Sequence, residues 1–155
     1  MIPIPEERLT GKLCQLLTEH LGEVLDAIEA EQGDGVRTEH LRTVDVDAAE
    51  LPSGDLPSAV IGVKKGELSE KDRILKNEVY VLQVRIGYTG PDTTKRGYRY
   101  AAAVGRVVET YPTLYGSCRR ALVKEKEYLL GRFAGDSEVA SVRVTIRATI
   151  ERLSG

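Results

Sequence analysis

The amino-acid sequence predicts an α+β domain in which a mostly antiparallel sheet of four or five strands carries two amphipathic helices on one face. Two segments, residues 77–88 and 138–150, place apolar or aromatic side chains at every second position, which predicts two long strands with one apolar face each. In two others, residues 6–31 and 95–111, apolar side chains recur with the spacing of a helical face. We expect these helices to cover the apolar faces of the strands.

The first helix is predicted over residues 6–31. Glu6 and Glu7 suit its positive N-terminal end, and Gly33 and Gly35 end it. Its apolar stripe consists of Leu9, Leu13, Leu16, Leu17, His20, Leu21, Val24 and Ile28.

Residues 36–76 predict a short strand, a loop and a hairpin. Val44 and Val46 alternate with acidic residues, which favours a short strand, although the residues before them are also compatible with a helical turn. Residues 47–57 contain two prolines and predict a loop. A second short strand at 59–65 leads through a charged connector around residues 66–76 into the long strand at 77–88. We expect an antiparallel hairpin whose tip projects into solvent.

The remaining residues predict a helix followed by one or two strands. Residues 95–111 form the helix, and Pro112 ends it. Residues 117–128 are compatible with a strand or a helix, and we favour a strand for the first half. Residues 131–137 predict a turn before the final strand. The candidate caps of the helix are Asp92, Thr93 and Thr94, and its polar face carries Arg99, Arg106 and Glu109.

Length and composition favour one domain over residues 1–155 that folds and stays in a cytoplasm. Hydrophobic residues make up 41% of the chain and charged residues 30%, as in ordinary globular proteins. No apolar run approaches the length of a membrane span, and the first seven residues lack the basic start of a secretion signal. Cys14 and Cys118 are far apart in apolar surroundings, so we expect reduced, buried thiols.

Charge is distributed unevenly along the chain. Residues 1–94 hold 10 Lys and Arg against 18 Asp and Glu, a net charge of −8, whereas residues 95–155 hold 12 against 6, a net charge of +6. Such asymmetry is compatible with simple solvation, with self-assembly or with a basic surface near nucleic acid. We favour the first two, because the chain is acidic overall and no run of Lys and Arg is interleaved with aromatic residues.

No pattern in the sequence predicts catalysis, a metal site or a cofactor. His20 lies on an apolar stripe and has no second ligand at metal spacing, which favours a packed histidine. The sequence also lacks a glycine-rich phosphate cradle, and Ser117 is not followed by the glycine of a nucleophile elbow. An acidic cluster before the prolines lacks the spacing of a calcium loop and is interpreted as a solvated loop; it comprises Asp45, Asp47, Glu50 and Asp55.

Two polar features are candidates for assembly. The non-core faces of the two long strands carry arginines with no acidic residue among them, which suggests either solvation or a face that meets a charged partner or lines a passage. The charged connector is either a floppy loop or an arm that docks on another subunit. The candidate interface or channel residues are Gln83, Arg85, Arg143 and Arg147; the candidate docking residues are Glu67, Glu70, Lys71, Asp72 and Arg73.

Over its whole length, the chain resembles the tail-terminator (tail-completion) family of tailed bacteriophages and related contractile particles. The resemblance rests on the order of elements rather than on a signature motif. Five segments carry it: the helix ERLTGKLCQLLTEHLGEVLDAI, the proline-bounded LPSGDLPSAVIGVKK, the strand NEVYVLQVRIGYTG, the helix RGYRYAAAVGRVVETY and the strand VASVRVTIRATI.

This resemblance implies a non-enzymatic virion protein. Six copies would form a ring that caps the finished tail tube, stops its polymerisation and offers a surface to the head or neck. The implied partners are further copies of the chain, a tail-tube protein and a head/neck connector protein, with DNA passing through the channel and no membrane or cofactor involved. The protein would be assembled in the host cytoplasm and reside in the virion tail.

Two other functions remain open from the sequence. One is a small dimeric adaptor or regulatory domain that binds a protein partner along its sheet edge. The other is an enzyme that acts on an anionic substrate at the arginine face.

Overall fold

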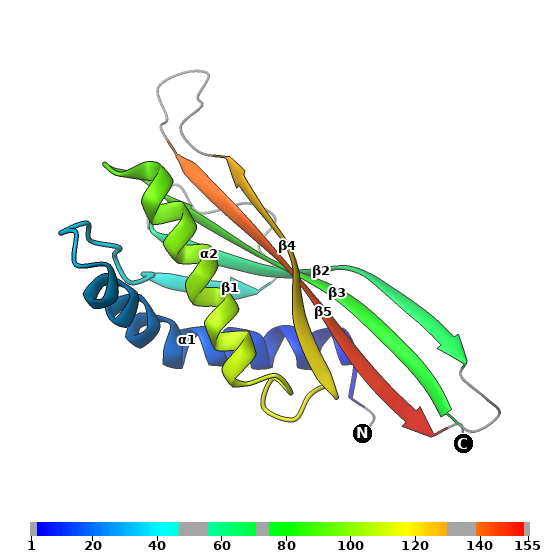
Figure 1. Ribbon diagram of the computed structural model, residues 1–155. Coiled ribbons are helices and arrows are strands. Elements are labelled where there is room, and N and C mark those ends of the chain that lie inside the picture. The colour runs from blue at the N-terminus through cyan, green and yellow to red at the C-terminus, as the bar shows by residue number, and fades with distance from the viewer. Residues whose placement is uncertain (1–2, 47–55, 71–74, 130–138, 154–155) are drawn as a thin grey trace.

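The computed structural model describes residues 3–46, 56–70, 75–129 and 139–153, which form two helices and a five-stranded sheet (Figure 1). The predicted α+β class is confirmed. The elements, in chain order, are α1 (Pro5–Gln32), β1 (Thr43–Val46), β2 (Ser58–Glu70), β3 (Leu75–Tyr88), α2 (Thr93–Thr110), β4 (Arg120–Leu129) and β5 (Ala140–Leu153).

The sheet has the strand order β1-β2-β3-β5-β4 and is antiparallel except for the pair β1 and β2, which is parallel. The two strands predicted from alternation, β3 and β5, lie side by side at its centre. They pair without interruption from Leu75 opposite Leu153 to Tyr88 opposite Ala140. By contrast, the register shifts by one residue at Lys64 in β2 and at Lys124 in β4, so each of these strands contains a bulge.

Both helices lie on one side of the sheet, with α1 against β1 and β2 and α2 against β4 and β5 (Figure 1). The apolar stripe of α1 meets the apolar face of the central strands, and burying these side chains is the main source of stability. Beyond the helices, the ends of β2, β3 and β5 continue together as an extended arm (Figure 1). The fully buried core includes Leu13, Leu16 and Leu25 of α1, Leu82, Val84 and Ile86 of β3, and Val144 and Ile146 of β5.

The ends of both helices follow local rules. Gly33 ends α1 in the left-handed conformation, with φ of 57°, and its N–H donates to the carbonyl of Glu29. Asp92 precedes α2, but its carboxylate accepts no hydrogen bond from the first turn, so the expected capping interaction is not made there. Neither of the two described helices combines the length and apolar composition that crossing a bilayer requires.

Two tyrosines anchor α2 to the rest of the molecule. Tyr88 and Tyr100 are fully buried with ring centroids 5.2 Å apart. The Tyr88 hydroxyl donates to the carbonyl of Thr93 at 2.7 Å, and the Tyr100 hydroxyl donates to the carbonyl of Glu39 at the same distance. Each ring therefore buries its apolar body without leaving its hydroxyl unpaired, and burial raises the pKa of both tyrosines to about 12.

Two expectations about the strands need correction, and a third concerns residues that the structure does not describe. The short strand predicted at 59–65 continues to Glu70, so much of the charged connector expected around 66–76 belongs to the hairpin strands, while residues 71–74 lie outside the described part. The segment from Ser117 to Arg119 is a turn, and β4 runs from Arg120 to Leu129 instead of occupying the first half of 117–128. The turn predicted at 131–137 lies outside the described residues.

In the arm, Gly66 provides the space in which the ring of Tyr80 lies. A Cβ atom at Gly66 would be 2.8 Å from Cε1 of Tyr80, whose side chain is only 6% exposed. We expect Gly66→Ala to lower the free energy of unfolding by about 1–3 kcal/mol, because the ring must move. Urea unfolding measures this loss.

Gly62→Ala in the same strand is the matched control, since a Cβ there meets no atom within 4 Å. It should change the free energy of unfolding by no more than about 0.5 kcal/mol. Equal losses for both variants would contradict the packing of Tyr80 on Gly66.

Candidate assembly surfaces

The face of the sheet opposite the helices, here called the open face, collects polar side chains from all four long strands. Its members follow from the register: side chains that alternate with the buried core residues point to this side. No described helix covers it. The open face includes Val60, Gly62, Lys65 and Glu67 of β2; Asn77, Val79, Val81, Gln83 and Arg85 of β3; Ser141, Arg143, Thr145, Arg147, Thr149 and Glu151 of β5; and Arg120, Leu122, Glu125, Glu127 and Leu129 of β4.

The structure brings the four predicted interface or channel residues together at the centre of the open face. Arg85 lies directly opposite Arg143, and Gln83 lies opposite Thr145 on the next row. Arg147 follows on β5 and is exposed, whereas the other three predicted residues are half-buried. Like charges on paired positions repel each other, so this arrangement requires compensating carboxylates.

These carboxylates come from the outer strands. Glu127 of β4 places Oε2 3.9 Å from Nη1 of Arg143. Glu67 of β2 accepts a hydrogen bond from Lys65, with Nζ and Oε1 2.9 Å apart; this contact and the charge of Lys65, with a smaller contribution from Arg147, lower the pKa of Glu67. Along the middle of the two central strands the arginines have no acidic residue among them, as predicted, but carboxylates of β2 and β4 border them, and Glu151 at the end of β5 pairs with Arg119.

The arm carries the described part of the predicted docking segment. Glu67 is exposed on β2, Glu70 ends that strand, and Lys71, Asp72 and Arg73 lie outside the described residues. On the helix-facing side of the arm, Leu68 is 74% exposed, since no helix extends that far. The arm is thus a protruding element with an uncovered apolar side chain.

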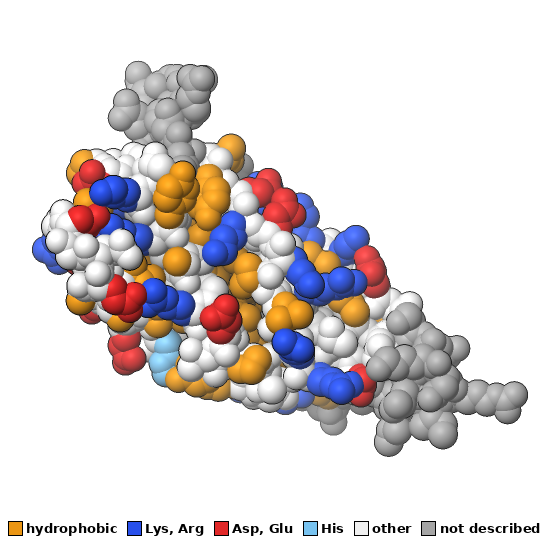
Figure 2. Space-filling model, viewed as in Figure 1, with side chains coloured by type: hydrophobic (Ala, Val, Ile, Leu, Met, Phe, Trp, Pro, Cys, Tyr) orange, Lys and Arg blue, Asp and Glu red, His pale blue; other side chains and the backbone are white. Residues whose placement is uncertain are grey.

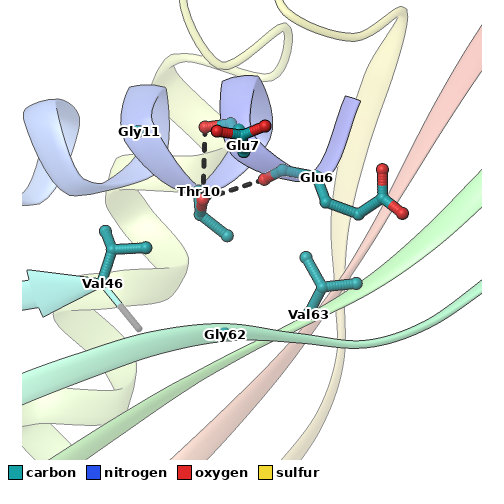
Figure 3. Close-up of a pocket in the computed structure, with 7 residues that line it drawn as sticks. All are labelled: Glu6, Glu7, Thr10, Gly11, Val46, Gly62 and Val63. Carbon is teal, nitrogen blue, oxygen red and sulfur yellow. Dashed lines mark hydrogen bonds between the residues drawn. The ribbon is translucent and has the colours of Figure 1, made fainter. Parts of the chain in front are cut away.

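A groove of about 400 Å³ opens between the first turn of α1 and the middle of β2 (Figure 3). Glu6 and Glu7 line it from the helix, and Val46, Gly62 and Val63 line it from the sheet. Its one hydroxyl, that of Thr10, donates back to the carbonyls of Glu6 and Glu7 at 2.9 and 3.2 Å and is therefore already satisfied (Figure 3). The groove is thus a concave surface to which Glu6 and Glu7 give negative charge.

An ion pair between buried Arg99 and exposed Asp34 connects α2 to the turn after α1. Arg99 is only 7% exposed; it donates to the carbonyl of Val36 at 3.0 Å and to the carboxylate of Asp34. Lys95 adds a second cation 3.2 Å from Asp34, whose Oδ1 also accepts the N–H of Val36. Sequence periodicity placed Arg99 on the exposed face of α2, which is wrong because the turn at Asp34 folds over it.

His20 is packed, as predicted from its place on an apolar stripe. Its ring stacks on Tyr111 with centroids 4.6 Å apart, and Nε2 lies 2.7 Å from the hydroxyl of Tyr115. That hydroxyl donates to Glu19 at 2.6 Å, a contact that raises the pKa of Tyr115 to about 12. The cluster holds the turn after α2 against α1.

The remaining candidates from the sequence are the two cysteines and the acidic loop. Cys14 and Cys118 are free thiols; Cys118 is buried, which raises its pKa to about 11, and Cys14 is half-buried. Among the described residues, no three His, Cys, Asp or Glu side chains converge as metal ligands would. Of the acidic loop, only Asp45 is described, as an exposed residue of β1.

We expect the Asp34 carboxylate to make the free energy of unfolding depend on pH in the acid range. Its hydrogen bond from Arg99, followed by the N–H of Val36, holds its pKa far below the ordinary value of 3.8. The ionised form therefore stabilises the folded state above pH 3.8, and this contribution is lost as the pH falls towards the folded-state pKa. We expect Asp34→Asn to be less stable than the native chain at neutral pH, by a margin that shrinks in acid.

Urea unfolding of both chains over a pH series measures this margin. Glu23→Gln, at an exposed position of α1, is the control and should follow the native chain throughout. A margin for Asp34→Asn that does not change with pH would show that charge at Asp34 is not the cause.

Comparisons with known proteins give little beyond this geometry. No known family model matches the sequence, and no curated protein matches it. Among solved structures, the chain is similar to one from the "Virion of native gene transfer agent (GTA) particle", with a TM-score of 0.40 and 13% sequence identity over 88% of this chain and 93% of that chain. Similarity at this level carries no argument about fold or function.

Proposed function

We propose that the chain is the subunit of a ring, hexameric by family resemblance, that caps a tail tube, ends its polymerisation and presents a surface to the head or neck. The observation that carries the proposal is the open face. It is a long, polar surface with arginines at its centre, on strands that extend beyond the helices. A sheet of this shape suits contacts with other subunits.

Termination follows from the geometry of such a ring. Identical subunits close a ring through head-to-tail contacts, which join two different surfaces of the chain. One rim would present the contacts of the next tube ring and bind the tube protein, and the other rim would lack them and meet the head/neck connector protein. The proposal places the protein in the virion tail after assembly in the host cytoplasm, as a non-enzymatic component.

The central arginine patch consists of Arg85, Arg143 and Arg147 on the open face. We assign it to subunit contacts or to the channel. A channel that lets DNA pass should not hold it, and several arginines per subunit would multiply phosphate contacts around a ring. Carboxylates from Glu127 and Glu67 reduce the net positive charge beside the patch. We therefore favour a role in subunit contacts for at least one of Gln83, Arg85, Arg143 and Arg147.

We assign the arm to docking on a neighbouring copy or on the tube. Exposed Leu68 favours this role, since docking would bury it. The charged residues of the predicted docking segment would select the partner; they are Glu67, Glu70, Lys71, Asp72 and Arg73.

Tube length measured by electron microscopy tests the capping function. The chain is added to the tube protein of the same particle while that protein polymerises, and we expect tubes to stop growing and to carry a ring at one end. Light scattering after size exclusion measures whether the chain alone forms a ring. Tubes of unchanged length without end rings would overturn the proposal, and a strict dimer that ignores the tube protein would favour the adaptor.

Replacing two patch arginines tests the role of the open face. We expect Arg143→Ala with Arg147→Ala to raise the concentration needed for ring formation by at least about tenfold while leaving the fold intact, because several contacts per ring are weakened together. Arg37→Ala, an exposed substitution in the loop after α1, is the control. Normal assembly of the double variant would place both arginines in the channel, and lost turnover of an anionic substrate with normal assembly would favour the enzyme.

A further inference from the structure

Each outer edge of the sheet has backbone groups with no described strand beside them. β1 pairs only with Ser58–Ile61, so the outer side of β2 from Gly62 onward has no partner among the described strands. At the opposite edge, no described strand pairs with the outer side of β4, and within β4 the N–H of Ala121 donates to the carbonyl of Pro112 at 2.7 Å. Unpaired edges of this length bind another strand readily.

The two edges have compatible directions. β5 runs in the same direction as β2, and β4 runs opposite to both. In a ring whose axis follows the strands, each copy keeps its strand directions, so β4 of one copy would meet β2 of the next in antiparallel orientation. Antiparallel pairing is slightly more stable per residue than parallel pairing.

The two edges also lie at the same height in the sheet. A row is here a set of residues that pair side by side across the four long strands. One row runs from Gly62 of β2 through Gln83 and Thr145 to Glu125 of β4, and another runs from Glu67 of β2 to Arg120 of β4. In a flat ring, Gly62 to Glu67 of one copy would therefore face Arg120 to Glu125 of its neighbour.

Charges on the two edges are complementary on both faces of the sheet. On the open face, Arg120 stands level with Glu67 of the next copy, and Glu125 stands one row from its Lys65. On the helix side, Lys126 pairs with core residue Val144 and therefore points towards the helix layer, where the neighbour presents the groove with Glu6 and Glu7.

The β4 edge is accessible for such a contact. In the segment that would pair, Arg120, Leu122, Lys124 and Glu125 are exposed, Val123 is half-buried, and Ala121 is buried in the core. Figure 2 shows mixed basic and acidic side chains along the band that β4 occupies in Figure 1.

We propose that β4 of one copy pairs in antiparallel fashion with the outer edge of β2, from Gly62 to Glu67, of the next copy. The sheets of neighbouring subunits then join edge to edge around the ring. This inference rests on the proposed ring and names the surfaces that close it. The competing arrangement is β4 paired with itself across a two-fold axis, with Lys124 beside Glu127; it would leave the β2 edge and the acidic groove uncovered and would stop at a dimer.

Disulfide trapping tests the contact. Gly62→Cys combined with Glu125→Cys places thiols on one row of the open face, and Gly62 has room for a side chain. On mild oxidation of the assembled protein, we expect a ladder of covalent oligomers up to the closed ring on non-reducing gels. Lys65→Cys with Glu125→Cys tests the adjacent row, since a tilted ring would shift the pairing along the strand.

Controls separate this contact from the alternatives. The native chain controls for bonds through Cys14 and Cys118, and each single variant should give no ladder. Dimers from Glu125→Cys alone would show β4 paired with itself and overturn the proposal. A ring seen by light scattering that yields no ladder from either pair would overturn the edge contact and leave the capping function standing, whereas absence of assembly with and without tube protein would overturn both.

A charge exchange provides an independent test. Glu67→Lys and Arg120→Glu should each raise the concentration for half-assembly by at least about tenfold, and the two together in one chain should return it to within about threefold of native. Within one subunit the two positions are separated by β3 and β5, so a restoration must come from contact between copies. Glu23→Lys makes the same change in net charge on exposed α1 and should leave assembly unchanged. Failure of the double exchange to restore assembly would contradict the pairing.

Discussion

The uninterrupted pairing of β3 with β5 is the constraint on which the rest of the molecule depends. Over this ladder every second side chain of each strand points to the helices, so Leu82, Val84, Val144 and Ile146 form one apolar surface that both helices cover. The same ladder turns the intervening residues to the other side, which places the arginines of both strands on the open face. A slip of one residue would exchange the two sets and destroy the core, so packing of the core also fixes the arginine patch.

The two bulges decide which charges the outer strands add to this face. Without the bulge at Lys124, alternation would turn Lys124 and Lys126 to the open face; with it, Glu125 and Glu127 stand there instead, beside the arginines of β5. The bulge at Lys64 has the same consequence in β2, where Lys65 and Glu67 face outward while Gly66 turns inward beneath Tyr80. One extra residue in each strand thus balances the central charge and creates complementary edges.

These bulges also mark the limit of what the sequence could predict. β3, β5 and both helices were predicted because their patterns keep one period throughout. In β2 and β4 the two-residue alternation breaks at Lys64 and Lys124, and most residues beyond these breaks are charged. The second half of β2 was therefore predicted as a connector, and the sequence of β4 was compatible with either a strand or a helix. Arg99 was misplaced for another reason: its partner Asp34 lies in a separate turn, and periodicity within one helix carries no information on a contact that a distant segment makes.

The predicted polar residues lie close together because β3 and β5, the two most regular strands, pair with each other. The carboxylates around them lie on β2 and β4, whose extent the sequence did not predict. This difference bears on function. Arginines alone at the centre of a sheet would suit an anion, but arginines bordered by carboxylates on unpaired, oppositely directed edges suit repeated contact with the same chain. In the proposed ring, the charge pattern would set the register between neighbours, since a mismatched row would bring like charges together. Assembly into a ring follows more directly from this arrangement than binding of a soluble anion does.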